Sequence, residues 1–379
     1  MYRWYLVLLF YLSFTGFQVC AQSGGINGNP GYITTAVPFL LVAPDARTSA
    51  MAGAGSAISL QNTVTNLNWA RTAFLDEKMG FAISYMPWLN RLARDRKLIS
   101  ADGFLKIDDR NVLGASLKYL SYGQFELSGV DQQISGILKP NELALNMSFS
   151  RKLSPEFSLA TTLAFISSSL YSANTNSAQL DKGNSVAVDV SLFYHNEIHL
   201  FNGPAIFGLA LCIENIGPKM SYENQNNSSF YLPSNLRLGS SVTFFDRNSD
   251  KFTFALDLSK LLVPSGSTAS FAAETDINQK SVLKGILTSF SDAPNGFPEE
   301  LEEVQLATGC EYSIKNKFAL RAGYSYQNPN KGNNSYFAFG FGVKHKNLGF
   351  DIAYLTGNTA VNSFSNTLRL TLAYNISNK

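Results

Sequence analysis

Apolar and polar residues alternate with a period of two along most of this chain from Met79 onward. The segment 251–262 is the clearest example, with large apolar residues at every second position: Phe252, Phe254, Leu256 and Leu258 against Thr253, Ala255, Asp257 and Ser259. A period of two sends successive side chains to opposite faces, which predicts β-strands. Alternating strands of about ten residues are typical of transmembrane β-barrels, whose walls are apolar toward lipid and polar toward the lumen.

The number and spacing of these segments point to the same architecture. About fourteen segments show the pattern, and single-chain bacterial barrels have an even number of strands. We place them at 79–88, 96–107, 111–122, 142–151, 156–170, 185–194, 205–216, 235–245, 251–262, 303–314, 318–327, 336–344, 348–355 and 366–376. Short turns such as 152–155 and 246–250 alternate with long loops such as 124–140, 217–233 and 263–302. A soluble β-sandwich, the alternative, has no reason to sort its loops in this way, whereas outer-membrane barrels do.

The beginning of the chain has the features of a secretory signal peptide. Arg3 is followed by an apolar stretch from Trp4 to Phe17 and by Val19-Cys20-Ala21, a small-residue cleavage site. A lipid-anchored Cys20 is the weaker alternative, because Val19 is bulky. No later apolar run approaches the ~18 residues of a membrane-spanning helix. We therefore expect a signal peptide over 1–21 and localisation in the bacterial outer membrane.

The segment 22–78 differs from the rest of the chain. It is rich in Gly, Ala, Asn and Thr, and two patches, 45–57 and 66–75, are expected to form helical turns. A segment of this size cannot bury a core of its own. We expect it to fold as a plug inside a barrel formed by residues 79–379.

Charged residues make up only 15% of the chain, against roughly 25% in soluble proteins. Those within the predicted strands fall on the polar face, where we expect them to line the lumen: Asp102, Lys118, Glu214, Arg237, Asp257, Arg321, Asp351 and Arg369. An Arg or Lys on the lipid face would cost ~2–4 kcal/mol. Because both signs are present, we expect internal ion pairs around a plug rather than an ion-selective channel.

Glycines are expected on the same lumen-facing side, where they would let the plug approach the wall closely. They are Gly103, Gly114, Gly208, Gly239, Gly323 and Gly340.

The residues give little support for enzyme chemistry. The three histidines, His195, His199 and His345, fall near predicted short turns, whereas a hydrolase of outer-leaflet lipid would need its histidine near the outer rim. No cysteine lies near them, so we expect no metal site and no cofactor. Cys212 and Cys310 are predicted on opposite faces of the wall, so no disulfide is expected. A net charge of +2 without a basic run does not indicate a nucleic-acid partner.

Two sets of residues in predicted outer loops are candidate binding sites. Arg91 and Arg94 lie beside Trp88, and they form either a solvated or lipid-headgroup contact or a docking surface for an acidic partner. The other set consists of Tyr222, Phe230 and Tyr231. Exposed aromatic residues are typical interface anchors, although they also form the girdle at a membrane boundary.

Several motifs resemble those of the PorV family, an outer-membrane component of the type IX secretion system, which is similar in fold to the FadL fatty-acid transporters. They are Pro44-Asp45-Ala46-Arg47, Met51-Ala52-Gly53-Ala54-Gly55, Tyr85-Met86-Pro87-Trp88-Leu89, Glu214-Asn215-Ile216-Gly217-Pro218, Asn235-Leu236-Arg237-Leu238-Gly239, Ala255-Leu256-Asp257-Leu258-Ser259 and Phe318-Ala319-Leu320-Arg321-Ala322-Gly323-Tyr324. The chain departs from the family at Asn68-Trp69-Ala70, where Asn-Pro-Ala is usual.

The resemblance implies a FadL-like barrel of fourteen strands without catalytic activity of its own. It further implies binding of the C-terminal signal domain of secreted cargo at a large outer-membrane translocon barrel, and delivery to a surface sortase complex that attaches cargo to lipopolysaccharide. Trp88, Tyr222, Phe230 and Tyr231 would contact the cargo, and the loop 263–302 would cap the site. The alternatives are transport of a hydrophobic small molecule and, as a third possibility, an enzyme of lipid A deacylation.

Overall fold

The alternating segments pair into one closed antiparallel sheet. The structure, a computed structural model, describes residues 33–59, 67–87, 95–128, 134–171, 181–201, 203–222, 229–246, 249–265, 280–357 and 366–377. The predicted signal peptide over 1–21 lies outside these residues. Pairing of the first and last barrel strands, for example Phe81 with Tyr374, closes the sheet. The prediction of an all-β chain with a fourteen-stranded barrel is confirmed.

The strands of the barrel follow one another in chain order around the wall. They are β1 (Glu77–Pro87), β2 (Arg96–Lys106), β3 (Asn111–Tyr122), β6 (Asn141–Lys152), β7 (Phe157–Tyr171), β8 (Asp181–Leu200), β9 (Gly203–Ile216), β12 (Asn235–Phe245), β13 (Lys251–Leu261), β14 (Gln305–Ile314), β15 (Phe318–Tyr326), β16 (Tyr336–His345), β17 (Leu348–Gly357) and β18 (Thr367–Ser377).

Predicted and observed strand bounds agree within two residues, except at 185–194, which extends to Asp181–Leu200. The extension at 195–200 is polar or half-exposed on both faces, as expected of a hairpin that leaves the membrane, where alternation is no longer required.

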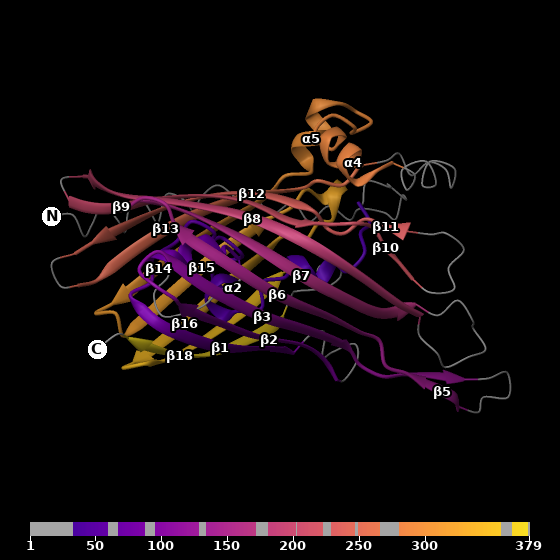
Figure 1. Cartoon of the computed structure of the whole chain (residues 1–379), viewed down its shortest axis with the longest axis horizontal. Coiled ribbons are helices and arrows are strands. Elements are labelled where there is room, and N and C mark those ends of the chain that lie inside the picture. Colours follow the sequence, from indigo (N-terminus) through magenta and orange to yellow (C-terminus); the bar gives the residue numbers. More distant parts are fainter. Residues whose placement is uncertain are drawn as a thin grey trace. The chain divides into compact units, whose positions relative to one another are not determined.

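The long loops at one end of the barrel carry additional short elements. Two small hairpins are formed by β4 (Phe125–Ser128) with β5 (Ile134–Leu138) and by β10 (Met220–Ser221) with β11 (Ser229–Phe230). The loop between β13 and β14 contains α4 (Val282–Thr288) and α5 (Phe297–Glu302), and η3 (Pro329–Lys331) lies between β15 and β16. Figure 1 shows α4 and α5 as an orange cluster that projects from the barrel. Among the described residues, no helix has the length and apolar character needed to span a membrane.

Burial in this barrel is the reverse of that in a soluble protein. On β13, Phe254 is 48% exposed whereas Asp257 is 1% exposed. On β18, Leu372 is 55% exposed whereas its neighbour Thr371 is 1% exposed. A wall with large apolar side chains outside and polar ones inside is suited to a lipid surround.

The interior contains the N-terminal segment, with η1 (Pro38–Leu41), α2 (Ala46–Ala50) and η2 (Trp69–Phe74). In Figure 1, α2 lies within the barrel. Asp45 and Asn68 cap α2 and η2, accepting hydrogen bonds from the backbone N–H groups of Thr48 at 2.7 Å and Ala70 at 2.9 Å. Both helices fall in the patches predicted to be helical. The core therefore forms between this segment and the inner wall; one cluster includes Phe39, Leu98, Leu120, Ile166 and Met220.

Glycines bring the N-terminal segment close to the wall. A Cβ on Gly323 would lie 2.3 Å from the backbone carbon of Met51, and one on Gly114 would lie 2.3 Å from the Trp69 ring. Gly208, Gly239 and Gly340 meet the same segment. The prediction for Gly103 is wrong, because it faces outward beside Phe81, as its position next to the inward-facing Asp102 requires.

Candidate functional site

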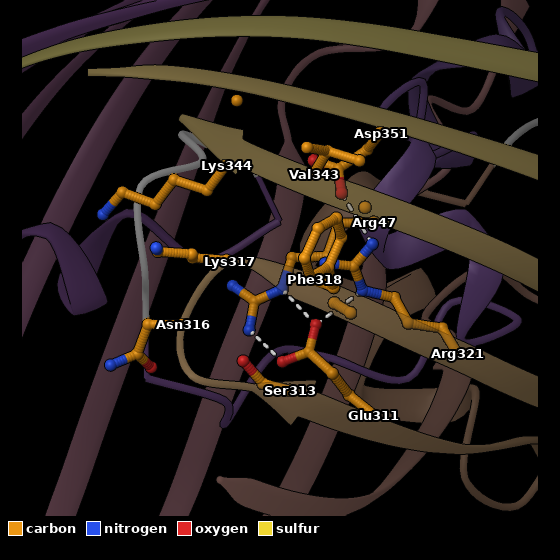
Figure 2. A pocket seen from close by; sticks show the side chains of 13 residues that line it. Arg47, Glu311, Ser313, Asn316, Lys317, Phe318, Arg321, Val343, Lys344 and Asp351 are labelled. Carbon is orange, nitrogen blue, oxygen red and sulfur yellow. Dashed lines mark hydrogen bonds and ion pairs between the residues drawn. The ribbon is translucent and has the colours of Figure 1, made fainter. Parts of the chain in front are cut away.

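The strongest connection between the N-terminal segment and the wall is a buried chain of four charges near the short-turn end. The carboxylate of Glu311 accepts hydrogen bonds from Arg47 at 2.8 and 2.9 Å and from Arg321 at 2.5 Å. Arg321 also donates to Asp351 at 2.6 Å. Figure 2 shows the Glu311 carboxylate between the two guanidinium groups. The four groups alternate in sign, so each cation has a carboxylate partner.

A second group of charges holds the segment nearer the middle of the barrel. Arg237 lies 3.4 Å from Glu214 and 4.0 Å from Asp257. Asp257 also accepts a hydrogen bond from the backbone N–H of Ser56 at 3.0 Å. This set ties β9, β12 and β13 to the N-terminal segment.

The remaining predicted lumen residues mostly contact the backbone of the segment. Lys118 donates to the carbonyl oxygens of Leu40 and Val42, both at 2.9 Å. Arg369 donates to the carbonyl oxygen of Ala43 and, at 2.5 Å, to the hydroxyl of Ser49. Asp102 differs, since it accepts from Ser100 on its own strand at 2.9 Å.

Three buried charged residues that hold the N-terminal segment were not predicted: Glu311, Arg47 and Arg71. Glu311 could have been found, because it shares the polar face of its strand with Gly309. Arg47 and Arg71 lie outside any periodic pattern. Arg71 donates to the carbonyl oxygens of Gly55 at 2.5 Å and Ile58 at 3.1 Å, joining two parts of the segment. Burial, together with the nearby charge of Arg47, lowers the pKa of Arg71 to about 10.

Among the residues that the structure describes, the titratable groups form no arrangement typical of a catalytic or metal centre. His195 lies on β8 near its short turn, where its ring stacks on Phe193 at 5.6 Å and meets the edge of Phe74 at 4.3 Å. In the described part of the chain, no three His, Cys, Asp or Glu side chains are grouped to hold a metal ion. Cys212 and Cys310 are free, the first buried in the lumen and the second in an outward-facing position.

The predicted outer-loop contacts need a correction. Trp88, Arg91 and Arg94 lie outside the described residues. The prediction that Tyr222 and Tyr231 are exposed is wrong: they are 9% and 5% exposed. The sequence showed that both lie between predicted barrel strands, but not that their side chains are buried.

The two tyrosines are held there by contacts within the chain. The Tyr222 hydroxyl lies 2.9 Å from that of Ser168, and the Tyr231 hydroxyl donates to the carbonyl oxygen of Lys280 at 2.7 Å. Phe230 is half-buried against Tyr222, with ring centroids 6.4 Å apart.

The loop between β13 and β14 exposes five large apolar side chains that the sequence analysis missed. We call this set the loop-helix surface. It consists of Leu283, Leu287, Phe290, Phe297 and Leu301, which are 72, 78, 51, 72 and 57% exposed. Leu283 and Leu287 in α4 are four positions apart, as are Phe297 and Leu301 in α5, so each pair lies on one face of its helix. That spacing could have been recognised within the long loop. Exposed apolar patches of this kind mark interaction sites.

Buried ion pairs fix α5 in place. Lys260 on β13 binds Glu300 at 2.8 Å and Glu303 at 2.5 Å. Lys331 in η3 binds Glu299 at 2.6 Å and Glu303 at 3.0 Å. The hydrogen bond from Lys331 lowers the pKa of Glu299. Burial acts to lower the pKa of Lys331, but hydrogen bonds to Glu299 and Glu303 outweigh it and raise that pKa.

Comparison with known proteins supports the same class of barrel. CymD, a monoaromatic hydrocarbon channel, is 11% identical with a TM-score of 0.51, over 89% of this chain and 98% of that chain. A deltaS2S3 mutant of the channel TodX is 11% identical with a TM-score of 0.51, over 88% and 99%. A Pseudomonas aeruginosa FadL homologue is 12% identical with a TM-score of 0.42, over 91% and 99%. At these identities the likeness to CymD and TodX shows the fold alone. No curated protein matches the sequence significantly.

Family membership comes from the sequence itself. Residues 27–268 of the 379 match the family model described as type IX secretion system protein PorV. Together with the closed barrel and its apolar outer wall, this match places the protein in the bacterial outer membrane. The chain belongs to the PorV family of the type IX secretion system.

Proposed function

We propose that this protein is a non-enzymatic adaptor that binds the C-terminal signal domain of secreted cargo at the translocon barrel. It then delivers the cargo to a cell-surface sortase and attachment complex. Family membership supports the secretion role. The observation that carries the adaptor role is the loop-helix surface, which presents large apolar side chains on the side of the long loops.

The anchoring of this surface favours tight binding. Lys260 and Lys331 connect α5 to β13 and to the neighbouring loop through four ion pairs. Gly285 packs α4 against Pro264 and Tyr231, where a Cβ would lie 3.0 and 3.1 Å from their side chains. A surface that is already ordered loses little conformational entropy when a partner binds. Burying one Leu or Phe side chain contributes about 1.5–3 kcal/mol.

The interior favours an adaptor over a transporter of small hydrophobic molecules. The N-terminal segment is fixed to the wall by the ion pair of Arg47 with Glu311, by the hydrogen bond from the Ser56 backbone N–H to Asp257, and by close contacts at Gly323. Passage past it would require these contacts to break. The lipid-modifying alternative gains no support, because His195, His199 and His345 lie at the short-turn end.

Further cargo contacts stay predictions. Phe230 is half-exposed beside the buried Tyr222, and it is the member of its set that is still available to a partner. Trp88, Arg91 and Arg94 are proposed contacts from sequence alone. Lipopolysaccharide and outer-membrane lipid would surround the outer wall.

The test is binding of an isolated cargo signal domain to the purified protein in detergent. We expect Leu283→Ala/Leu287→Ala to weaken binding by at least about tenfold, since two buried leucines are lost. The matched control is Leu209→Ala on the outer wall, where the side chain is 42% exposed. Unchanged affinity in the double variant, or an equal loss in the control, would contradict the proposal.

A further inference from the structure

A small cavity of about 50 Å³ lies at the short-turn end of the barrel, beside the ion pair of Arg47 with Glu311. Its lining includes Lys317, in the turn between β14 and β15, and Lys344, near the end of β16. The volume admits a group of a few non-hydrogen atoms, since one water needs about 10–15 Å³. The short turns of outer-membrane barrels face the periplasm, so a solute would reach this cavity from there. The proposed adaptor role does not use it.

Two lysines face each other on the lumen side of the wall. Phe318 pairs with Val343, and the backbone N–H of Lys344 donates to the carbonyl oxygen of Lys317 at 2.7 Å. The two lysines are therefore directly opposite on adjacent strands. Phe318 is 46% exposed on the outer wall, so the alternation directs its neighbour Lys317 inward. Like charges directly opposite destabilise a sheet, and an anion between them would remove that penalty.

The charges around the cavity leave an excess of two positive charges. The lining contains four cations and two carboxylates: Arg47, Lys317, Arg321, Lys344, Glu311 and Asp351. Both carboxylates already have guanidinium partners, Glu311 two and Asp351 one. Among the described residues neither lysine has a carboxylate within 4.0 Å. At longer range Lys344 interacts with Glu77 and with the additional cation Lys251, whose charges cancel.

Hydrogen-bond donors come from both the wall and the N-terminal segment. Arg47 binds Glu311 through Nε and one terminal nitrogen. In Figure 2 its other terminal nitrogen lies on the same side of Glu311 as Lys317 and Lys344, whose side chains extend beyond it. The Ser313 hydroxyl and the Asn316 amide, also in the lining, are neutral donors. Guanidinium and ammonium groups together are a typical donor set for phosphate.

We propose that this cavity binds a free phosphate dianion, as inorganic phosphate or a small soluble phosphomonoester. Two excess positive charges match a dianion, whereas a carboxylate would balance only one of them. A lipid phosphate fits less well, because the lysines are on the lumen side of the wall and lipid surrounds the outer side. The phosphate would connect Arg47 of the N-terminal segment to Lys317 and Lys344 of the wall, and so help to hold the segment in the barrel.

The experiment is calorimetric titration of inorganic phosphate into the full mature chain in dodecyl maltoside micelles, at about pH 8, where phosphate is mainly a dianion. We expect a dissociation constant of about 1 mM or lower, and binding of acetate at least about tenfold weaker. Lys317→Gln and Lys344→Gln should each weaken phosphate binding by at least about tenfold, because each removes a charged hydrogen bond. The matched control is Lys346→Gln, which removes the same charge from the neighbouring turn but does not line the cavity.

Trypsin cleavage after Arg71, which is 3% exposed in the N-terminal segment, gives a second measurement. Saturating phosphate should slow this cleavage at least about tenfold in the unaltered protein, because it binds the closed form. It should not do so in Lys344→Gln, which separates binding from the general stabilising effect of phosphate salts. No detectable binding at millimolar phosphate, unaltered affinity in both lysine variants, or an equal loss in Lys346→Gln would overturn the proposal. None of these results bears on cargo binding, so the two proposals fail separately.

Discussion

Replacing Glu311 by Ala is the sharpest test of how the N-terminal segment is held. Glu311 accepts three hydrogen bonds, two from Arg47 and one from Arg321, and its side chain is 6% exposed. After the substitution Arg321 keeps Asp351 at 2.6 Å, whereas Arg47 loses its carboxylate. One buried cation is then stranded. Removing one partner of a buried pair costs about 3–5 kcal/mol.

This cost should appear as easier release of the segment rather than collapse of the wall. Arg71 is a trypsin site that is 3% exposed, so cleavage there reports release. When reclosing is faster than cleavage, the rate follows the open population. At 1.4 kcal/mol per factor of ten, about 3–5 kcal/mol predicts a cleavage rate roughly 10²–10³-fold higher or more. Circular dichroism would verify that the barrel remains folded.

The control and a double-mutant cycle make the prediction refutable. Leu320→Ala, outward-facing and 53% exposed next to Arg321, should leave cleavage unchanged. Arg47→Ala combined with Glu311→Ala should cost less than the sum of the single changes by about 1–3 kcal/mol, because the stranded charge is also removed. Additive single changes, or cleavage of Glu311→Ala at the unaltered rate, would show that the ion pair does not hold the segment.

Three further predictions address packing and pH. Gly323→Val should lower the free energy of unfolding in urea by about 1–3 kcal/mol or more, because the new side chain would meet the backbone of Met51. Gly103→Val is the control and should cause no such loss, because a Cβ there has no atom nearer than the Gly80 carbonyl oxygen at 3.5 Å. Trp69→Ala should cost about 3–5 kcal/mol in the same assay, and a smaller loss would mean that its 3%-exposed ring contributes little packing. Because the pKa of Glu299 is lowered, its ionised form stabilises the fold above pH 4.5, and this stabilisation is lost when acid protonates the carboxylate at its lowered pKa. Because the pKa of Lys331 is raised, its protonated form stabilises the fold below pH 10.5, and this stabilisation is lost only at higher pH. A spin label at Ser291→Cys should therefore gain mobility in acid but not between about pH 5 and 10, and immobility in acid would contradict this.

Much of the barrel was predictable because the pattern that specifies it is local. Alternation along β13 and β18 reports the two faces of each strand without knowledge of the neighbouring strands. The same rule could have identified Glu311 as a lumen residue and excluded Gly103. It could not indicate that Tyr222 is buried, because its burial depends on contacts with Ser168 and other residues distant in the chain.

The sequence by itself determined the class of fold, the membrane-facing side of each strand and the family of the protein, since all three are written in short-range patterns and motifs. Only the tertiary structure decided which charges meet: Arg47 reaches Glu311 across 264 positions of the chain, and Lys331 reaches Glu299 across 32. It also decided that Arg369 on β18 contacts Ala43 and Ser49 of the N-terminal segment. Pairing of buried charges depends on a few ångströms of separation, and that distance is set by closure of the barrel around its N-terminal segment.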